Sequence, residues 1–239
     1  HRMPLRSVAA TAASQPIAFE PGTKAQYSNV GIDIGAAVVE VVTGKRWETF
    51  LQERVLDPLG MKDTTFWPTD AQLAKKIEIY SVKPGEEAKW VEQNSAMQRP
   101  YGDDRVFPSA GAGLWTTVRD QLKFYKMLMN LGVGENGVRI LKEETVKSIL
   151  AVSTRPKGLG GYSLGLSAPE TDAEDQWFGH GGAWATNCVV NWHKRQLKLI
   201  AVQFIKDTKQ FASAFNEGAN KFFKTQIDKS TDEYSGRMK

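Results

Sequence analysis

The segment 177–205 constrains the fold of this chain most strongly. Trp177 to Trp192 alternates in hydrophobicity and is rich in aromatic and β-branched residues, and Leu197 to Ile205 is again strongly apolar. Residues 193–196 between them are polar and suit a turn, so the pattern predicts an antiparallel β-hairpin. Glycines weaken the start of its first strand and indicate the close approach of a ligand or another backbone: Gly179, Gly181 and Gly182.

Helical patterns lie on both sides of this hairpin. The stretch after Tyr27-Ser28-Asn29 repeats apolar residues at helical spacing, namely Val30, Ile34, Val38 and Val41. Ser28 or Asn29 suits the N-cap of this helix, and Gly44 suits the position after its last turn. Further helices are predicted over 47–56, 69–76, 143–150 and 209–226, and from Thr117 onward. An antiparallel sheet flanked by helices predicts an α+β fold.

Two of the later helices carry additional signals. Thr117 with Asp120 resembles a capping box, and the buried face of the helix that follows is expected to hold Leu122, Tyr125, Leu128 and Met129. The last helix is expected to lay an apolar face on the sheet, formed by Phe211, Phe215, Ala219, Phe222 and Phe223. By contrast, residues 80–105 are polar and aperiodic, which predicts a loop.

A phenol and an amide stand at the entrance of the helix that begins near residue 29. A tyrosine fixed there can carry a proton to and from a reacting group. An asparagine amide can both donate to a substrate carbonyl and accept from an ammonium group. Tyr27 and Asn29 are therefore candidate catalytic residues. The alternative is that Asn29 only caps the helix and Tyr27 only packs.

The glycine-rich start of the hairpin supplies the second group of candidates. His180 directly precedes Gly181 and Gly182, where a substrate can lie against the backbone. The backbone N–H of Ala183 can then serve as one half of an oxyanion hole.

Composition and charge exclude several classes of function. The net charge of +4 is mild and the positive residues are spread along the chain, so nucleic-acid binding has little support. No stretch approaches the ~18 consecutive apolar residues of a membrane span. The single cysteine, Cys188, excludes an internal disulfide and is expected to be buried. The three histidines lack metal-ligand spacing, so no metal site is expected.

A second motif competes for the nucleophile. Gly161 to Gly165 fits G-x-S-x-G, and Asp172, Asp175 and His180 follow in the order of an α/β-hydrolase triad. A nucleophile elbow needs a strand before the serine and a helix after it. The flanking sequence is rich in Pro and Gly and leads into an acidic loop, so a short strand from Tyr162 to Leu166 is the favoured interpretation.

Five ordered segments resemble the serine β-lactamase and penicillin-binding-protein superfamily, in the branch of class C β-lactamases, esterases and D-aminopeptidases. They are Phe19 to Thr23, Tyr27 to Asn29, Pro58 to Thr64, Ser109 to Leu114, and His180 to Gly182. Tyr27 and Asn29 match the Y-x-N motif, while His180-Gly181-Gly182 stands where many members have Lys-Thr-Gly. Because esterases and peptidases of this branch also carry histidine there, the resemblance favours a hydrolase over a β-lactamase.

The resemblance implies a β-lactamase-like fold and an acyl-enzyme mechanism on a small ester, peptide or β-lactam. Tyr27 would help to move the nucleophile's proton, Asn29 would orient the substrate, and His180 would contact the leaving group or a substrate carboxylate. Ala183 would polarise the carbonyl. Candidates for the walls of the cleft are Tyr101, Arg105, Phe107 and Trp115, with packing in the fold as an equal alternative for each of them. A periplasmic or secreted location is also implied.

The same resemblance implies one catalytic domain over 1–239, with a helical subdomain at about 27–150 and the sheet and C-terminal helix at about 160–227.

One element of the superfamily is missing. No serine in the chain has a lysine three residues later, so the S-x-x-K motif that supplies nucleophile and activating lysine is absent. In the superfamily this motif precedes the Pro-Gly turn at Pro21-Gly22, and the chain starts too late to contain it. We expect an incomplete N-terminus, with Ser and Lys on a further segment of the same protein. The alternative is a non-catalytic relative that retains the cleft as a binding or interaction module.

Overall fold

The computed structural model describes residues 4–82, 87, 89–90, 107–151, 161–168, 176–206, 217–218, 221–222 and 224–225. They fall into two compact units. The first unit holds the described residues up to 76, from 107 to 180, and from 189 to 197. The second holds those at 77–90, at 181–188, and from 198 onward.

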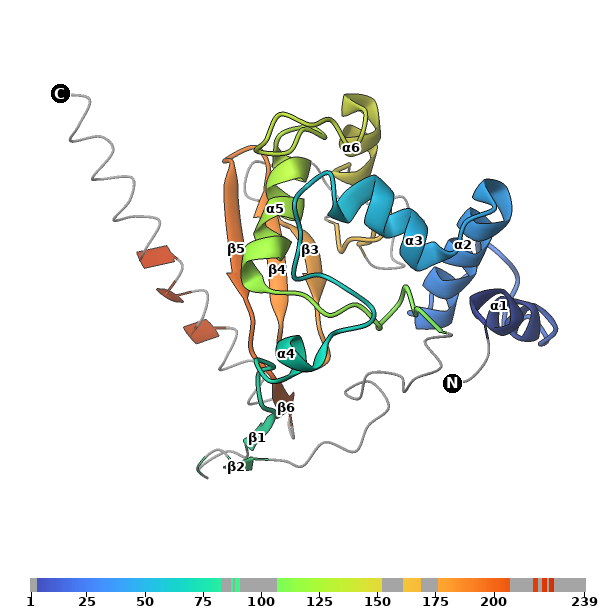
Figure 1. Cartoon of the computed structure of the whole chain (residues 1–239), viewed down its shortest axis with the longest axis horizontal. Helices are drawn as coiled ribbons and strands as arrows, with labels where there is room; N and C mark the ends of the chain where they lie inside the picture. The colour runs from blue at the N-terminus through green and yellow to red at the C-terminus, as the bar shows by residue number, and fades with distance from the viewer. Residues whose placement is uncertain are drawn as a thin grey trace. The chain divides into compact units, whose positions relative to one another are not determined.

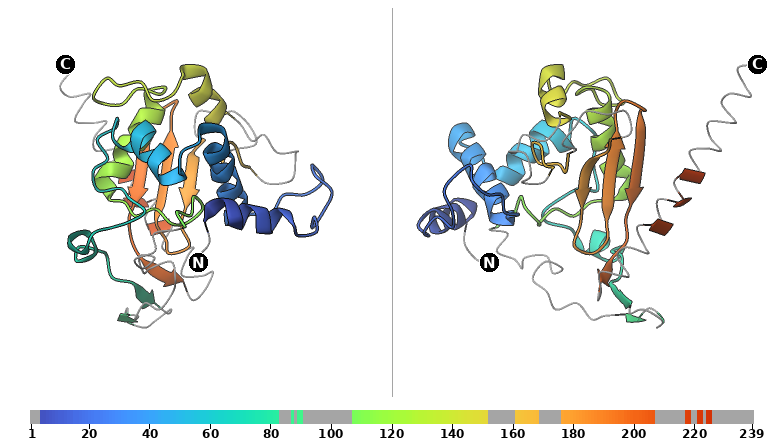
Figure 2. Two further views of the ribbon diagram at one scale, coloured as in Figure 1. Left: turned by 45° about the vertical axis from the view of Figure 1, so that its right-hand side comes forward. Right: turned by 180° about the vertical axis from the view of Figure 1, so that it is seen from behind.

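The first unit begins with two helices that pack against each other (Figures 1 and 2). Helix α1 spans Leu5–Ala13, and α2 spans Asn29–Thr43. The Ser28 side chain caps α2 by accepting a hydrogen bond from the Gly31 N–H at 3.1 Å. Gly44 ends the helix in the left-handed conformation with φ 69°. Both predicted ends of α2 are therefore confirmed, whereas α1 was not predicted.

Helices α1 and α2 pack against each other around a small buried core. This core consists of Leu5, Ala36, Ala37 and Phe107. At the far end of α2, the Glu40 carboxylate accepts from Arg6 Nε at 3.2 Å and from the Trp47 N–H at 2.8 Å. Phe107 is part of this core, which is the packing role left open for it beside a place in the cleft wall. Tyr101 and Arg105 lie outside the described residues.

The apolar face of α2 points away from this core. Its exposed side chains include Val30, Ile34, Val38 and Val41, with Val41 67% exposed. The buried residues of the helix are instead Asp33, Ala36, Ala37 and Glu40. The periodicity predicted the helix correctly, but the described residues do not cover its valine and isoleucine face.

Short helices follow. Helix α3 spans Trp47–Leu51 and continues as the π-helix η1 over Gln52–Leu56, which confirms the predicted helix at 47–56. Helix α4, Asp70–Leu73, is shorter than predicted. It starts at a capping box between Thr69 and Gln72.

Helix α5 spans Val118–Met129 and α6 spans Glu143–Ile149. Thr117 caps α5 by accepting from the Asp120 N–H at 3.2 Å. The other half of the predicted capping box does not form, because the Asp120 carboxylate accepts from the Asp63 N–H at 2.7 Å and from the Thr64 hydroxyl at 3.1 Å. Asp120 thus ties the start of α5 to the Pro58 to Thr64 segment.

The buried face of α5 is close to the predicted one. Tyr125 and Leu128 are buried as expected, Met127 is buried in addition, and Leu122 and Met129 are partly buried. The end of α5 is held by Arg195, whose guanidinium donates to the Asn130 side chain at 2.8 Å. Figure 1 shows α5 alongside the strands that Arg195 joins.

Three strands form one sheet in the order β3-β4-β5. They are β3 Phe178–Gly181, β4 Asn187–Asn191 and β5 Gln196–Ile200. Short turns join consecutive strands, so neighbours run antiparallel. The predicted hairpin is confirmed as β4 and β5 with a turn at 192–195, but its first strand is in fact two strands. The break lies in the glycine-rich stretch, where Ala185 adopts φ 70°.

The second unit contains strands that the sequence did not predict. β1 Tyr80–Val82 pairs antiparallel with β2 Lys89–Trp90 and parallel with β6 Phe204–Lys206. Residues 80–82 and 89–90 are therefore not loop. The predicted strand 197–205 is also divided, because β5 ends at Ile200 and β6 pairs with β1.

The predicted C-terminal helix is described in part. Residues 217–218, 221–222 and 224–225 are helical. Phe222 is 60% exposed. The remaining members of the predicted apolar face lie outside the described residues.

Within the described ranges no helix has the length and apolar character needed to cross a membrane.

Candidate active site

The structure brings Tyr27 and His180 together. Their ring centroids are 5.9 Å apart with an interplanar angle of 38°. Tyr27 stands directly before the cap of α2 and is 63% exposed, while His180 lies on β3. Two predicted site residues from distant parts of the sequence, the exposed Tyr27 and the half-buried His180, therefore form one aromatic pair in the first unit.

A second tyrosine flanks His180. The Tyr162 ring meets the imidazole edge-on, with centroids 6.2 Å apart and an interplanar angle of 88°. Its position follows from backbone pairing, because Ser167 bridges to Tyr162 on one side and to Gly179 on the other. The hydrogen bond from the Ser167 N–H to the Gly179 carbonyl measures 2.7 Å. Sequence reasoning noted Tyr162 only as part of G-x-S-x-G, and no local signal marked it as a neighbour of His180.

The serine of that competing motif is not built as a nucleophile. Ser163 is only 6% exposed, and its hydroxyl donates to the Ser148 carbonyl at 3.3 Å. Gly165 turns the chain with φ 85°, and no helix follows Ser163 within residues 161–168. The chain bends at 164–166 and reaches β3 only through the bridge of Ser167 to Gly179, so an elbow is excluded. The predicted short strand from Tyr162 to Leu166 is also wrong, because only Tyr162 and Ser167 form isolated bridges.

Asn29 is the first residue of α2 and is half-buried. The segment 107–113 passes directly over it. A Cβ added at Gly111 would lie 2.7 Å from the Asn29 carbonyl oxygen and 2.8 Å from the Asn29 Cβ, which only glycine avoids. This contact explains physically why position 111 is a glycine.

The predicted oxyanion residues lie in the second unit. Gly181 ends β3, and the Gly182 N–H donates to the Thr186 carbonyl at 2.6 Å. Ala183 is exposed and sits in the turn that follows, not in a strand as expected. Within the described part of the chain its N–H has no hydrogen-bond partner. A Cβ on Gly181 would meet nothing nearer than 3.9 Å, so internal packing does not require glycine there.

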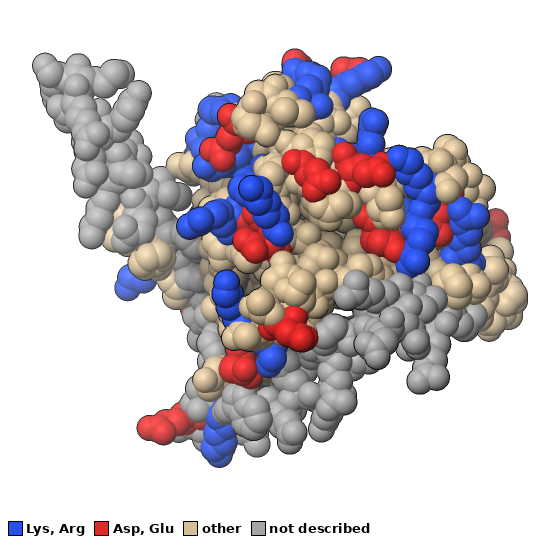
Figure 3. Space-filling view, in the orientation of Figure 1, with Lys and Arg blue, Asp and Glu red and all other residues tan. Residues whose placement is uncertain are grey.

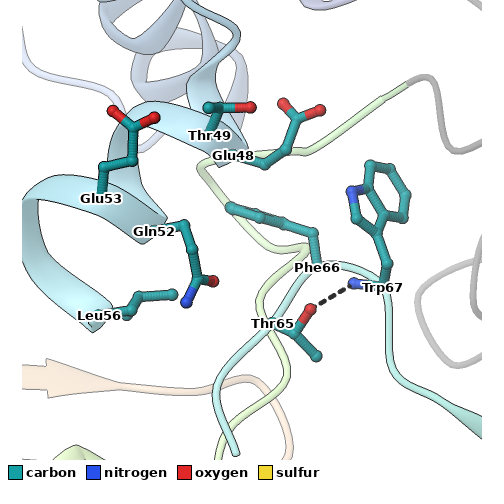
Figure 4. A pocket seen from close by; sticks show the side chains of 8 residues that line it. All are labelled: Glu48, Thr49, Gln52, Glu53, Leu56, Thr65, Phe66 and Trp67. Carbon is teal, nitrogen blue, oxygen red and sulfur yellow. Dashed lines mark hydrogen bonds between the residues drawn. The ribbon is translucent and has the colours of Figure 1, made fainter. Parts of the chain in front are cut away.

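A separate hollow of about 390 Å³ lies elsewhere in the first unit (Figure 4). Its walls come from α3, η1 and the segment after Thr64, and they hold Glu48, Thr49, Gln52, Glu53, Leu56, Thr65, Phe66 and Trp67. None of the predicted catalytic residues lines it. Trp115, another predicted cleft residue, pairs with Thr65 through two backbone hydrogen bonds of 2.9 Å.

The charge pattern matches the expectation from sequence. On the face seen in Figure 3, basic and acidic side chains are interspersed. Among the described residues no group of three His, Cys, Asp or Glu side chains could hold a metal ion. Cys188 is buried, as predicted.

A family model described as Beta-lactamase matches residues 2–212. The chain belongs to the beta-lactamase family. This membership, within the serine β-lactamase and penicillin-binding-protein superfamily, confirms the resemblance drawn from the five sequence segments.

Proteins similar to this chain include an enzyme named as an esterase and another named as an amidase. Lovastatin esterase of Penicillium rubens is 28% identical over 193 residues, which is 74% of this chain and 45% of the esterase. N-acetylmuramyl-L-alanine amidase of Bacillus subtilis is 24% identical over 192 residues, covering 74% of this chain and 43% of the amidase. The chain thus spans less than half the length of these curated relatives.

Solved structures confirm the fold. EstCE1, described as a hydrolase with promiscuous acyltransferase activity, superposes with a TM-score of 0.66 at 21% identity, over 85% of this chain and 57% of that one. The predicted α+β, β-lactamase-like fold class is therefore correct.

Proposed function

We propose that this chain belongs to a serine hydrolase, which forms an acyl-enzyme on ester or amide substrates. The chain supplies most of the residues of the active site. The observation that carries the proposal is the contact between the exposed Tyr27 at a helix entrance and the half-buried His180 on a sheet strand. A phenol held against an imidazole at an open surface can reach a bound substrate and its nucleophile.

Each residue has a distinct role in this proposal. Tyr27 moves the proton of the nucleophile, and Asn29, two residues later, orients the substrate carbonyl or accepts from a catalytic ammonium. His180 contacts the leaving group or a substrate carboxylate.

The nucleophilic serine and its lysine come from a further segment. Three observations support this part of the proposal. No serine in the chain belongs to an S-x-x-K motif, and the chain spans less than half of its curated relatives. The valine and isoleucine face of α2 is also uncovered, which is the state expected of a helix whose neighbour is on another segment.

The names of the relatives are consistent with either an ester or an amide as the substrate of the proposed enzyme. One relative is named an esterase and another an amidase. Histidine in place of lysine at position 180 favours ester or peptide substrates over β-lactams. No bound metal or organic cofactor takes part in the proposed steps.

Active-site labelling tests the proposal. We expect a fluorophosphonate probe to leave the 239-residue chain unlabelled and to label a longer polypeptide that joins this chain to an S-x-x-K segment. Ser163→Ala in the longer polypeptide is the matched control and should still label. Labelling of the 239-residue chain at Ser163 would overturn the proposal.

The role of Tyr27 is tested in that longer polypeptide. Tyr27→Phe keeps the ring beside His180 but removes the proton carrier, so kcat and kcat/KM should fall by about 10²-fold or more. Tyr162→Phe also removes a phenol beside His180 and should cost far less. Equal rates for Tyr27→Phe and the unmodified enzyme would remove Tyr27 from the mechanism.

The absence of S-x-x-K favours one other function, a non-catalytic binding module that keeps the family fold. Its test is the reading frame that contains this chain. If no S-x-x-K motif is encoded and Tyr27→Phe leaves ligand binding unchanged, the module replaces the enzyme as the better account.

A further inference from the structure

A buried carboxylate lies one helical turn after Asn29. Asp33 is only 3% exposed. The Ser109 hydroxyl donates to its Oδ1 at 3.1 Å and lies 3.4 Å from its Oδ2. The Gly111 N–H donates to the same Oδ1 at 3.1 Å. Two neutral donors from one loop therefore hold this carboxylate.

Asp33 differs from the other buried carboxylates described in the first unit. Glu40 on the same helix pairs with Arg6, and Asp120 on α5 pairs with Lys123 at 2.9 Å. Within the described ranges no Lys, Arg or His forms an ion pair with Asp33. A buried charge without a cationic partner is expensive, and stability alone does not favour it over an apolar residue.

The loop at 109–113, which donates both hydrogen bonds to Asp33, also contacts Asn29. Residues i and i+4 of a helix lie on one face, so Asp33 and Asn29 present neighbouring positions to the same loop. At Gly111 the loop is so close to Asn29 that a Cβ would fall 2.9 Å from the Asn29 Cα. Ser109 is itself buried, and the Gly113 N–H donates to its carbonyl at 2.9 Å, which closes the loop on itself.

We infer that Asp33 is a positioning residue for the candidate active site. Through the Ser109 hydroxyl and the Gly111 N–H it fixes the 109–113 loop on the first turn of α2. This loop then limits the movement of Asn29, and of Tyr27 at the entrance of the helix. The inference rests on the proposed function, because it assigns Asp33 to the same reaction. A displacement of about 1 Å in a catalytic group can cost about 10²-fold in rate.

Steady-state kinetics of the longer polypeptide test the inference. Asp33→Ala should lower kcat about 10- to 100-fold with KM within about threefold, since substrate still binds but the catalytic groups lose their alignment. Asp33→Asn should recover kcat to within about threefold, because an amide fills the same space and the Ser109 hydroxyl can turn to accept from it. Ser109→Ala should give an intermediate loss.

Glu40→Ala is the matched control. It removes a second buried carboxylate from the same helix, two turns further from Asn29, and should lower thermal stability while kcat at 25 °C stays within about twofold. Equal losses of kcat in Asp33→Ala and Glu40→Ala would overturn the inference, because they would reflect general loosening of α2. Failure of Asp33→Asn to recover kcat would also overturn it.

An NMR measurement separates this inference from the proposed function. Asp33→Ala should shift and broaden the side-chain amide signals of Asn29 and speed exchange of the Gly111 amide, whereas Asp33→Asn should leave both close to the parent. If Tyr27→Phe has no kinetic effect, the proposed reaction fails, yet these signals still decide whether Asp33 fixes the loop. Unchanged Asn29 signals in Asp33→Ala would refute it.

Discussion

Helices α2 and α5 are both described from cap to cap, yet they bury opposite kinds of surface. In α5 the large side chains of Tyr125, Met127 and Leu128 are buried. In α2 the buried residues are two alanines and two carboxylic acids, while its valines and isoleucines are exposed except for the half-buried Val39. A surface helix ordinarily places its apolar stripe toward the core, as α5 does.

The contrast shows that α2 packs on α1 through its alanines, whereas no described residue covers its valine and isoleucine face. Residues Val30 to Val42 expose at least five large aliphatic side chains on one helix: Val30, Ile34, Val38, Val41 and Val42. A contiguous apolar surface of this kind marks an interaction site. It is also where a further segment of the proposed hydrolase would find its packing surface.

Core truncation should give the largest difference between the helices. Leu128→Ala on α5 should lower the free energy of unfolding by about 2–5 kcal/mol, because it leaves a cavity in a filled core. Val38→Ala on α2 should change it by less than about 0.5 kcal/mol in the 239-residue chain. Urea unfolding measures both. A comparable loss for Val38→Ala would mean that the α2 face is covered in solution.

The exposed apolar face of α2 should also make the chain self-associate, whereas the buried face of α5 should not contribute. We expect the 239-residue chain to be oligomeric or poorly soluble, since the α2 face is open and β5 pairs with β4 alone among the described strands. Val38→Ser with Val41→Ser should raise the monomer fraction in size-exclusion chromatography with light scattering. A monodisperse monomer of the unmodified chain would contradict the expectation and favour the self-contained module.

The same double substitution should behave differently in the longer polypeptide. There the α2 face is expected to be covered, so Val38→Ser with Val41→Ser should lower its thermal stability. A melting temperature equal to that of the parent would show that no further segment packs on α2.

Loss of the N-caps should have a smaller and equal effect on the two helices. Ser28→Ala and Thr117→Ala each remove one side-chain acceptor from an exposed helix start, at a cost of about 0.5–2 kcal/mol. Ser28→Asp and Thr117→Asp, which retain an acceptor, are the controls. Urea unfolding that showed a loss for only one helix would mean that capping contributes unequally to α2 and α5.

A surface ion pair provides the smallest expected effect. Lys147 lies 2.6 Å from Glu143 on α6, and its hydrogen bond and charge lower the pKa of the Glu143 carboxyl. The pair therefore favours the folded state above the ordinary carboxyl pKa and loses that effect as the pH falls through the lowered value. Lys147→Ala should raise the pKa of Glu143 in an NMR titration. Lys142→Ala, beside it, should not.

The ends of the helices follow from local chemistry and could be predicted. Ser28 accepts from a backbone N–H and Gly44 takes a left-handed conformation whatever the rest of the fold does, so α2 was placed to within a residue. The glycines after His180 were predicted to weaken the start of the strand, and the strand does break there. Their effect was greater than predicted, because they divide the expected strand and place Ala183 in a turn.

Features that depend on distant partners could not be predicted. β1 and β6 are three residues each, too short to show a period, and exist because Tyr80, Ser81 and Val82 pair with Phe204, Ile205 and Lys206. Phe107 looked suited to a cleft wall, but its place in the core follows from the packing of α1 on α2. Asp33 gave no signal at all, since its role depends on a loop far along the chain.

The sequence by itself determined the family, the α+β class, the ends of α2, and Tyr27, Asn29 and His180 as candidates, because caps, turns and motifs are written in neighbouring residues. Tertiary structure alone decided that Tyr27 meets His180, that Tyr162 joins them, that Ser163 is buried, and which face of α2 is covered. A hydrophobic period shows that a helix has an apolar side but not which partner covers it. On α2, helix α1 packs against the alanines and not against the valine and isoleucine face.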